Sequence, residues 1–404
     1  MIVLGERVVS MKETFWSRNF IFLMISNALL FMAFEMLMPT LPLFVESLGG
    51  SPSQIGLVTG VFMCSAILIR PFSGTLIQLL DKKYVLIIGV VICMLATGSY
   101  MLSTSLVLLL VFRLVHGFGF GIASTLYATS ASDDLPPHRM GEGMGYFGVG
   151  ETVAISVGPL LGIWMLHAAG FSGLFSTGAI ILLLSLVMSI LVRRRSANPT
   201  TADTAKDKKK VPFKLFEKRV LLQSGLVLLI GVVAGGVMSF VALFAKEQGF
   251  NNAAWFFFTV AMASFLVRLV SGRIFDTKGP AYILIPAGIV LIVAIVLVAS
   301  SRTELQFLVA AVLYGLSFGA IFPALQAWAI SVVGEDERED AVGSFYNFFD
   351  LGIGGGSLIL GMIAGLTSYK TMYLFSTLLI AAYLIIFVVY SVLDKKKSRN
   401  TLNV

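Results

Sequence analysis

Residues 193–219 read RRRSANPTTADTAKDKKKVPFKLFEKR and form the only long polar stretch of the 404-residue chain. The sequence on both sides of it consists of apolar runs of about 20 residues or more, the length that a helix needs to cross a bilayer. Six runs precede the polar stretch and six follow it, at residues 19–44, 53–77, 83–102, 105–129, 143–167, 172–192, 220–245, 251–275, 281–300, 304–331, 341–365 and 370–392. This pattern predicts an all-α integral membrane protein with twelve transmembrane helices. We expect a six-helix bundle in residues 1–192, a cytoplasmic linker in 193–219 and a second six-helix bundle in 220–404.

The composition supports a membrane protein. Hydrophobic residues make up 57% of the chain and charged residues 13%, with a mean hydropathy of +0.92. A soluble chain would carry about a quarter charged residues, so this much apolar surface can be hidden only in a bilayer. The two cysteines, Cys64 and Cys93, both lie in apolar runs, which excludes a disulfide scaffold.

The basic residues predict the orientation. If the N-terminus is cytoplasmic, 23 of the 29 Lys and Arg residues fall on the cytoplasmic side and 3 outside, and the remaining 3 lie within apolar runs. Cytoplasmic loops are enriched in Lys and Arg. We therefore expect a multi-pass protein of the plasma membrane with both termini in the cytoplasm. The same distribution accounts for the net charge of +7 without a nucleic-acid partner.

The two halves of the chain repeat each other. The end of the second run, IRPFSG at 69–74, matches VRLVSG at 267–272, and Arg268 follows Arg70 by 198 residues. Gly117 and Gly121 match Gly315 and Gly319 at the same spacing, and Glu151 matches Asp350 at 199. Repeated six-helix units indicate two pseudo-symmetric halves that move around a central site.

Several motifs in these helices resemble those of the major facilitator superfamily. GRIFDTKG at 272–279 is similar to the family's loop signature G-x-x-x-D-R/K-x-G, through Gly272, Asp276, Lys278 and Gly279. RLVHG at 113–117 resembles R-x-x-Q-G of helix four, with His116 in place of Gln. Gly158, Pro159 and Gly162 resemble the G-P-x-x-G motif of helix five, which marks antiporters in this superfamily. The loop of the first half departs from the signature, because Gln78 stands at the acidic position and Asp81 at the glycine position.

The resemblance covers the whole chain and implies the drug/proton-antiporter-like exporter branch. It implies a bacterial, monomeric protein that handles protons and a small molecule, without a cofactor or a metal. The glycines and the proline of helix five allow a bend and a close helix neighbour. Close packing alone is the alternative interpretation.

Charges inside the membrane are costly, so each should face a partner or a cavity. Glu35 and Arg113 fall near the midplane in helices one and four, which line the central cavity of the family fold. Burial disfavours an ionised carboxylate and a nearby Arg favours it, a balance that suits proton coupling. A static ion pair is the alternative. His116 is expected to be a hydrogen-bonded packing residue rather than a proton relay.

Four further charges form a symmetric set. In the family fold, helix two packs on helix eleven, and helix five packs on helix eight. This packing predicts the pairs Arg70–Asp350 and Glu151–Arg268, which would hold a cytoplasmic gate shut in the outward-open state. In the alternative, each Arg reaches the headgroups or a loop of its own half.

Aromatic side chains on these helices suggest a pocket for amphiphilic ligands. The candidates are Phe34, Tyr127, Tyr146, Trp328 and Tyr346, together with Phe31, Phe147, Phe240 and Phe349. The alternative for each is a place in the core or against lipid.

The sequence therefore predicts a proton-coupled exporter of small amphiphilic or drug-like molecules. A dedicated exporter of one metabolite, such as a metallophore, a sugar or a lipid-like compound, is the alternative. A membrane enzyme or sensor is disfavoured, because no H-E-x-x-H, G-x-S-x-G or D-x-x-D cluster lies at a predicted membrane face, and the chain has only three histidines. The chain also lacks the G-x-x-x-x-G-K-[ST] motif of an ATP-driven pump.

Overall fold

The computed structural model describes residues 16–135, 140–193, 217–250, 253–334 and 338–402. Within these ranges the chain is helical and contains no strand. The helices are α1 (Arg18–Ser47), α2 (Pro52–Leu79), α3 (Lys82–Ser99), α4 (Leu106–Asp133), α5 (Met140–Leu191), α7 (Leu221–Glu247), α8 (Ala253–Lys278), α9 (Ala281–Ser300), α10 (Glu304–Ser331), α11 (Arg338–Leu366) and α12 (Tyr369–Leu402), with short 3₁₀ turns η1 (Tyr100–Leu102) and η3 (Lys218–Val220).

The twelve predicted membrane crossings are accounted for within the described residues. Eleven helices there are long and apolar enough to span a bilayer. One of them, α5, consists of two helices joined at Gly170, whose φ of 66° and ψ of −169° interrupt the helical backbone. A side chain at this φ would be strained, so glycine fits the tight reversal. The two parts of α5 correspond to the predicted runs at 143–167 and 172–192.

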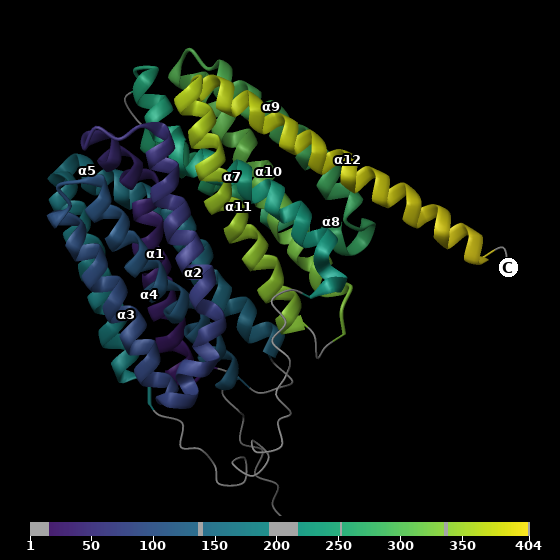
Figure 1. Cartoon of the computed structure of the whole chain (residues 1–404). Coiled ribbons are helices and arrows are strands. Elements are labelled where there is room, and N and C mark those ends of the chain that lie inside the picture. The colour runs from purple at the N-terminus through teal and green to yellow at the C-terminus, as the bar shows by residue number, and fades with distance from the viewer. Residues whose placement is uncertain (1–15, 136–139, 194–216, 251–252, 335–337, 403–404) are drawn as a thin grey trace, which may run out of the picture.

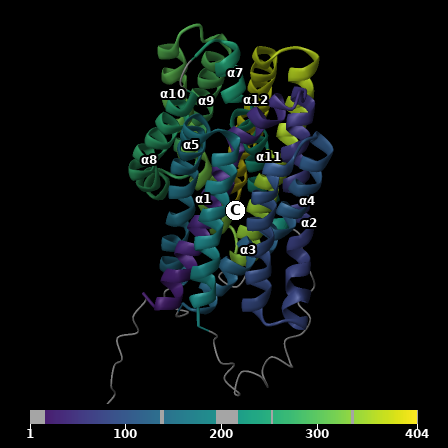
Figure 2. The same cartoon turned by 90° about the vertical axis from the view of Figure 1, so that its left-hand side faces the viewer.

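The helices form two groups that meet along their length. Figure 1 shows α1 to α5 on one side and α7 to α12 on the other, with α2 and α11 adjacent where the groups meet. After a quarter turn, α5 and α8 lie on the left and α2 and α11 on the right (Figure 2). We call the side where α5 ends and α7 begins the linker side, because residues 193–219 join these two helix ends.

Matching glycines build matching helix crossings in the two halves. In the first half, a side chain at Gly117 or Gly121 of α4 would overlap the α2 backbone, at Phe62 and Ala66 respectively. In the second half, Gly315 and Gly319 of α10 press in the same way on α8, at Val260 and Ser264. Each contact partner, like each glycine, is displaced by 198 residues, so the repeat seen in the sequence is also a repeat of packing.

Helix α11 lies between α2 and α7, and two of three successive glycines allow its close contact with both helices. A Cβ at Gly354 would lie 2.6 Å from the Met63 Cβ of α2, whereas one at Gly356 would overlap the Val232 backbone of α7. A Cβ at Gly355 would meet nothing within 4 Å. Small residues allow membrane helices to approach backbone to backbone, and here they do so on two sides of one helix.

These three glycines provide a matched test of the packing. Gly356→Ala should lower the free energy of unfolding by about 1–3 kcal/mol, because the added methyl group has no room beside Val232. Gly355→Ala should change it by no more than about 0.5 kcal/mol. Unfolding of the purified protein by dodecyl sulfate in mixed micelles, followed by tryptophan fluorescence, measures both. Equal effects of the two substitutions would contradict the described arrangement of α11.

Candidate functional site

The predicted Arg70–Asp350 ion pair is present between α2 and α11. A guanidinium nitrogen of Arg70 lies 2.6 Å from Asp350 Oδ2, and the two side chains are 19% and 16% exposed. The same guanidinium donates a hydrogen bond of 3.0 Å to Asn347 Oδ1, one helical turn before Asp350 on α11. A charge-assisted contact of this kind is about twice as strong as a neutral one. The ion pair joins the two halves.

The second predicted pair is not formed in this conformation. Glu151 of α5 accepts a hydrogen bond of 3.0 Å from Asn27 of α1, within its own half. Among the described residues no ion pair joins Glu151 to Arg268. The prediction from the repeat therefore holds for one crossing of the halves and not for the other, because Asn27 supplies an alternative donor to Glu151.

Three carboxylates lie close enough to interact between the halves. Asp350 repels both Glu35 and Glu151, and Arg70 attracts Glu151. Glu35 is 5% exposed, and its Oε2 atom has no hydrogen-bond partner in the described part of the chain. A buried, incompletely bonded carboxylate is energetically expensive. Such a group is a candidate for binding a proton or a cation.

The expected contact between Glu35 and Arg113 needs correction, because the described residues contain no ion pair between them. Glu35 lies at the α1–α5 crossing, with its Cβ against Gly158. Arg113 instead faces α2: its Nε is 3.4 Å from the Val58 carbonyl oxygen, and its guanidinium lies 4.1 Å from the centre of the Phe62 ring. The two charges are thus held by different helix crossings.

Arg113 belongs to a buried polar group on α4. It is 2% exposed, and Nη1 has no hydrogen-bond partner among the described residues. His116, one turn along α4, shares a hydrogen bond of 2.7 Å with the Tyr100 hydroxyl through Nδ1. This contact agrees with the expectation that His116 is a hydrogen-bonded packing residue.

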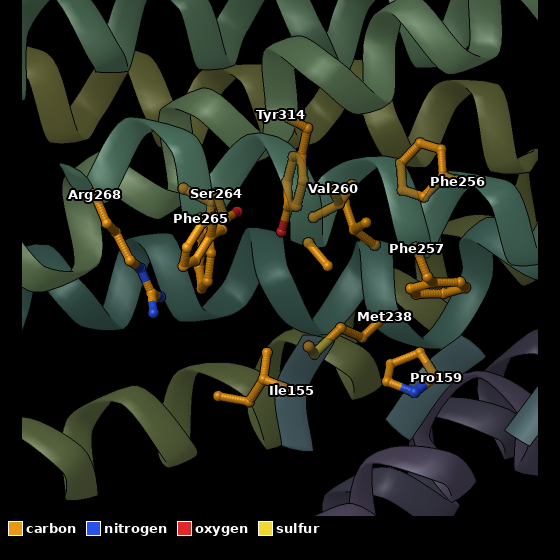
Figure 3. A pocket seen from close by; sticks show the side chains of 13 residues that line it. Ile155, Pro159, Met238, Phe256, Phe257, Val260, Ser264, Phe265, Arg268 and Tyr314 are labelled. Carbon is orange, nitrogen blue, oxygen red and sulfur yellow. The ribbon is translucent and has the colours of Figure 1, made fainter. Parts of the chain in front are cut away.

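A pocket opens between the halves on the side of α5 and α8 (Figure 3). Ile155 and Pro159 of α5 face Met238 of α7 and a long stretch of α8, from Phe256 to Arg268. Tyr314 and Phe318 of α10 complete one wall. Ligand sites of transporters with repeated halves lie at the interface of the halves, so this pocket is the candidate site for a small molecule.

None of the first five aromatic candidates predicted from the sequence lines this pocket. Phe34 stacks on Phe62 with ring centres 5.1 Å apart, and Tyr127 is fully buried against Ser185 and Ser189 of its own half. Trp328 packs on Phe387 and Tyr390 of α12, Tyr146 lies 5.0 Å from Trp16, and Tyr346 contacts Gln326 at 3.3 Å. The aromatic walls come instead from Phe256, Phe257 and Phe265 of α8 and from Tyr314 and Phe318 of α10.

The motif residues of α5 lie where α5 meets α1. Gly158 abuts Glu35, and Gly162 abuts the backbone of Met36, so both glycines permit a close crossing. Pro159 is buried and reaches the pocket. Along α5 the backbone leaves helical torsions at Gly170 rather than at Pro159.

The loop signature lies at the linker-side end of α8. Gly279 ends the helix with a φ of 84° and donates its N–H to the Phe275 carbonyl oxygen at 2.9 Å. Gly272, Asp276 and Lys278 are exposed, and the Lys278 ammonium lies 5.8 Å from the Tyr282 ring. In the divergent loop of the first half, Asp81 caps α3 by accepting the Lys83 N–H at 2.9 Å.

A further pair joins the halves on the side opposite the linker and was not predicted. Lys246 of α7 lies 2.7 Å from Glu46 of α1, and the two side chains are 64% and 41% exposed. Exposed pairs stabilise by about 0–1 kcal/mol. This contact therefore marks where α1 and α7 approach, without holding them strongly.

The sequence matches a family model described as Major Facilitator Superfamily over residues 23–357 and 283–404. A staphylopine export protein of Staphylococcus aureus is 27% identical over 91% of this chain and 94% of its own. A multidrug resistance protein, MdtG, of Enterobacter lignolyticus is 25% identical over 90% of each chain.

Solved structures share the fold. The nucleoside transporter NupG superposes with a TM-score of 0.72 at 15% identity, over 91% of this chain and 99% of its own. An inward-facing, unoccupied bacterial homologue of the human lysosomal transporter Spinster gives 0.71 at 14%, over 92% and 94%.

The burial of the Arg70–Asp350 pair predicts its strength. Asp350→Asn should lower the free energy of unfolding by about 1.5–3 kcal/mol, because it leaves a largely buried guanidinium without its anion. The control is Asp133→Asn, which breaks the Lys82–Asp133 pair at the same 2.6 Å distance where Asp133 is 58% exposed. That change should cost no more than about 1 kcal/mol. The same dodecyl sulfate titration compares them, and a smaller loss for Asp350→Asn than for Asp133→Asn would refute the assignment.

Proposed function

Because the chain belongs to the major facilitator superfamily, and is therefore a transporter of small molecules rather than an enzyme, we propose that it is a proton-coupled secondary exporter of amphiphilic or drug-like molecules. It works by alternating access. The halves 1–192 and 220–404 move about the site between them, and residues 193–219 link them. The linker side faces the cytoplasm of a bacterial cell, as the distribution of Lys and Arg supports.

The observation that carries this proposal is the acidic cluster between the halves. Asp350 repels Glu35 and Glu151, and the only ion pair that the described residues form within the cluster is Arg70–Asp350. A proton on Asp350 relieves the repulsion on both other carboxylates, and a proton on either of those relieves the repulsion on Asp350. Since these groups come from both halves, uptake or release of a proton changes how strongly the halves attract. This is the link that coupled transport needs.

The direction of transport rests on the relatives and on α5. Relatives over nine tenths of the chain are named for staphylopine export and for multidrug resistance. Gly158 of the G-P-x-x-G motif lies against Glu35, so the antiporter-type motif and the candidate proton site touch. A dedicated exporter of one metabolite is the second candidate, favoured by the name of the staphylopine export protein.

Glu35 provides the test of coupling. In inside-out vesicles with an acidic lumen, the wild-type protein should accumulate at least one of three dyes: ethidium, fluorescein or Nile red. Glu35→Gln should abolish accumulation, because an amide of the same size cannot exchange a proton, whereas Glu35→Asp should retain part of it. The measurement is dye uptake before and after an ionophore collapses the pH gradient.

Glu247→Gln is the control, since Glu247 is an exposed carboxylate at the far end of α7. It should accumulate dye as the wild type does. Wild-type rates in Glu35→Gln vesicles would place coupling at another carboxylate, with Glu151 and Asp350 as the next candidates. No gradient-dependent uptake of any dye by the wild type would contradict the export proposal itself.

The charges on α2, α5, α8 and α11 are proposed to bias the opening on the linker side. Asp350→Asn combined with Glu151→Gln removes both acids that can hold the halves together there, so the population should shift toward the inward-open form. If one pair is worth about 1.4 kcal/mol, the ratio of forms changes about tenfold. Spin labels at Val149 and Arg273, in a background without Cys64 and Cys93, would report the distances by pulsed electron resonance. An unchanged distance distribution would argue against a gate.

A further inference from the structure

The Tyr314 hydroxyl is a polar group in the middle of the pocket between α5 and α8. Of the thirteen side chains that line the pocket, three carry an oxygen or a nitrogen atom: Ser264, Arg268 and Tyr314. The Ser264 hydroxyl donates to the Gly315 carbonyl oxygen at 2.9 Å, and Arg268, at one end of the pocket, interacts within the protein. The Tyr314 hydroxyl forms no hydrogen bond with the described residues. Of these three groups, it is the one left for a ligand.

Aromatic side chains lie on both sides of this hydroxyl. Tyr314 comes from α10, and Figure 3 shows its oxygen directed away from α10, toward the side where Met238 lies. In the same view Phe265 is on one side of Tyr314, and Phe256 and Phe257 are on the other. Phe257 and Phe265 are eight residues apart on α8, or about 12 Å along the helix. A ligand of that length meets a ring at each end and a hydroxyl between them.

Neighbouring rings hold Tyr314 in place. Its ring is parallel to that of Phe318 within 5°, with centres 5.9 Å apart, and its centre lies 6.5 Å from that of Phe256. The side chain is only 4% exposed. A ring packed in this way presents its hydroxyl at one place in the pocket, and such preorganisation favours a specific contact with a ligand.

A hydroxyl at a ligand site selects for a matching atom. While the pocket holds water, a water molecule can bond to the hydroxyl. A ligand that fills the pocket displaces this water, and the hydroxyl then loses its hydrogen bond unless the ligand supplies one. Phenylalanine would provide the same aromatic wall without this penalty. Sites built with such a group reject analogues that lack the matching atom. Because a phenolic O–H is a hydrogen-bond donor, the matching atom is an acceptor.

We propose that the pocket binds uncharged molecules with two aromatic ends and a carbonyl oxygen between them, such as diaryl ketones, and that Tyr314 donates a hydrogen bond to this oxygen. One ring of the ligand lies beside Phe265 and the other beside Phe256 and Phe257. The assignment rests on the proposed exporter function and names a substrate class of that exporter, with Tyr314 as a residue that determines specificity.

Two probes of one shape test the hydrogen bond: benzophenone and diphenylmethane, which differ only in a central carbonyl or methylene group. Their dissociation constants for the wild type and Tyr314→Phe would be measured by calorimetry on the purified full-length protein in one detergent. Each probe partitions into the micelles equally for both proteins, so the ratio of its two constants reports the hydroxyl alone. Tyr314→Phe should weaken benzophenone about three- to tenfold. Diphenylmethane should bind the variant at least as tightly as it binds the wild type.

Bound benzophenone can also report its own position. Under near-ultraviolet light its carbonyl oxygen takes a hydrogen atom from a nearby C–H group, and the two carbon radicals then join in a covalent bond. If the carbonyl lies at Tyr314, mass spectrometry of the irradiated protein should find the label on the pocket lining, at Met238 of α7 or at Val260 of α8. Excess diphenylmethane should reduce this labelling, because it occupies the same pocket.

Two control variants separate the hydroxyl from shape and folding. Tyr383→Phe removes the same atom from α12, outside the pocket, where the hydroxyl donates to the Leu284 carbonyl oxygen at 3.3 Å. It should leave both dissociation constants at the wild-type values. Phe257→Ala shortens the aromatic wall and should weaken both probes by a similar factor. Gel filtration would confirm that each variant remains folded.

The proposal is overturned if Tyr314→Phe changes both probes by the same factor, if the label falls outside the pocket lining, or if benzophenone does not bind the wild type. These outcomes can be told apart from a failure of the exporter assignment. A protein that pumps a dye in a Glu35-dependent manner but treats both probes alike would keep its proposed function and lose this substrate class. A protein that selects benzophenone through Tyr314 but shows no gradient-driven uptake would keep the site and lose the coupling.

Discussion

Charge that must be kept inside a membrane constrains this molecule more than any other feature. A single ion at mid-bilayer costs about 2.5–3.5 kcal/mol on insertion scales, so each one has to be enclosed by protein. The Arg70–Asp350 contact encloses two of them at once and does so between the halves. The close crossing of α2 and α11 is what makes this possible, because their glycines bring the backbones near enough for side chains to meet.

The fold could be read from the sequence because it depends on local hydrophobicity. Runs of about 20 apolar residues, separated by short polar segments, located every crossing within a few residues. The join at Gly170 lies in the four residues between two predicted runs, and its positive φ separates the two helices that make up α5. The 198-residue sequence repeat is also a repeat of helix contacts, since Gly117 lies against the backbone of Phe62 and Gly315 against the equivalent backbone of Val260.

The site could be predicted only in part, because it depends on which of several possible partners each polar side chain contacts. The repeat paired Arg70 with Asp350, but it equally paired Glu151 with Arg268, and it contained no information that Asn27 offers Glu151 a nearer donor. Depth in the membrane placed Glu35 and Arg113 at one level. It could not show that Glu35 faces α5 while Arg113 faces α2. Similarly, Tyr127 is an aromatic residue of the kind expected in a ligand pocket, but its hydroxyl is bonded to Ser185 and Ser189 in the buried interior of its own half.

The two seams between the halves differ in a way that matters for motion. Along α2 and α11 the backbones touch, and an ion pair reinforces the contact, whereas α5 and α8 leave a pocket between them. These seams lie on opposite sides of the bundle (Figure 2). When one rigid body turns about a fixed edge, displacement grows with distance from that edge. A rotation about the α2–α11 seam would therefore open the α5–α8 side most, whereas opening of the linker side requires Arg70 and Asp350 to separate.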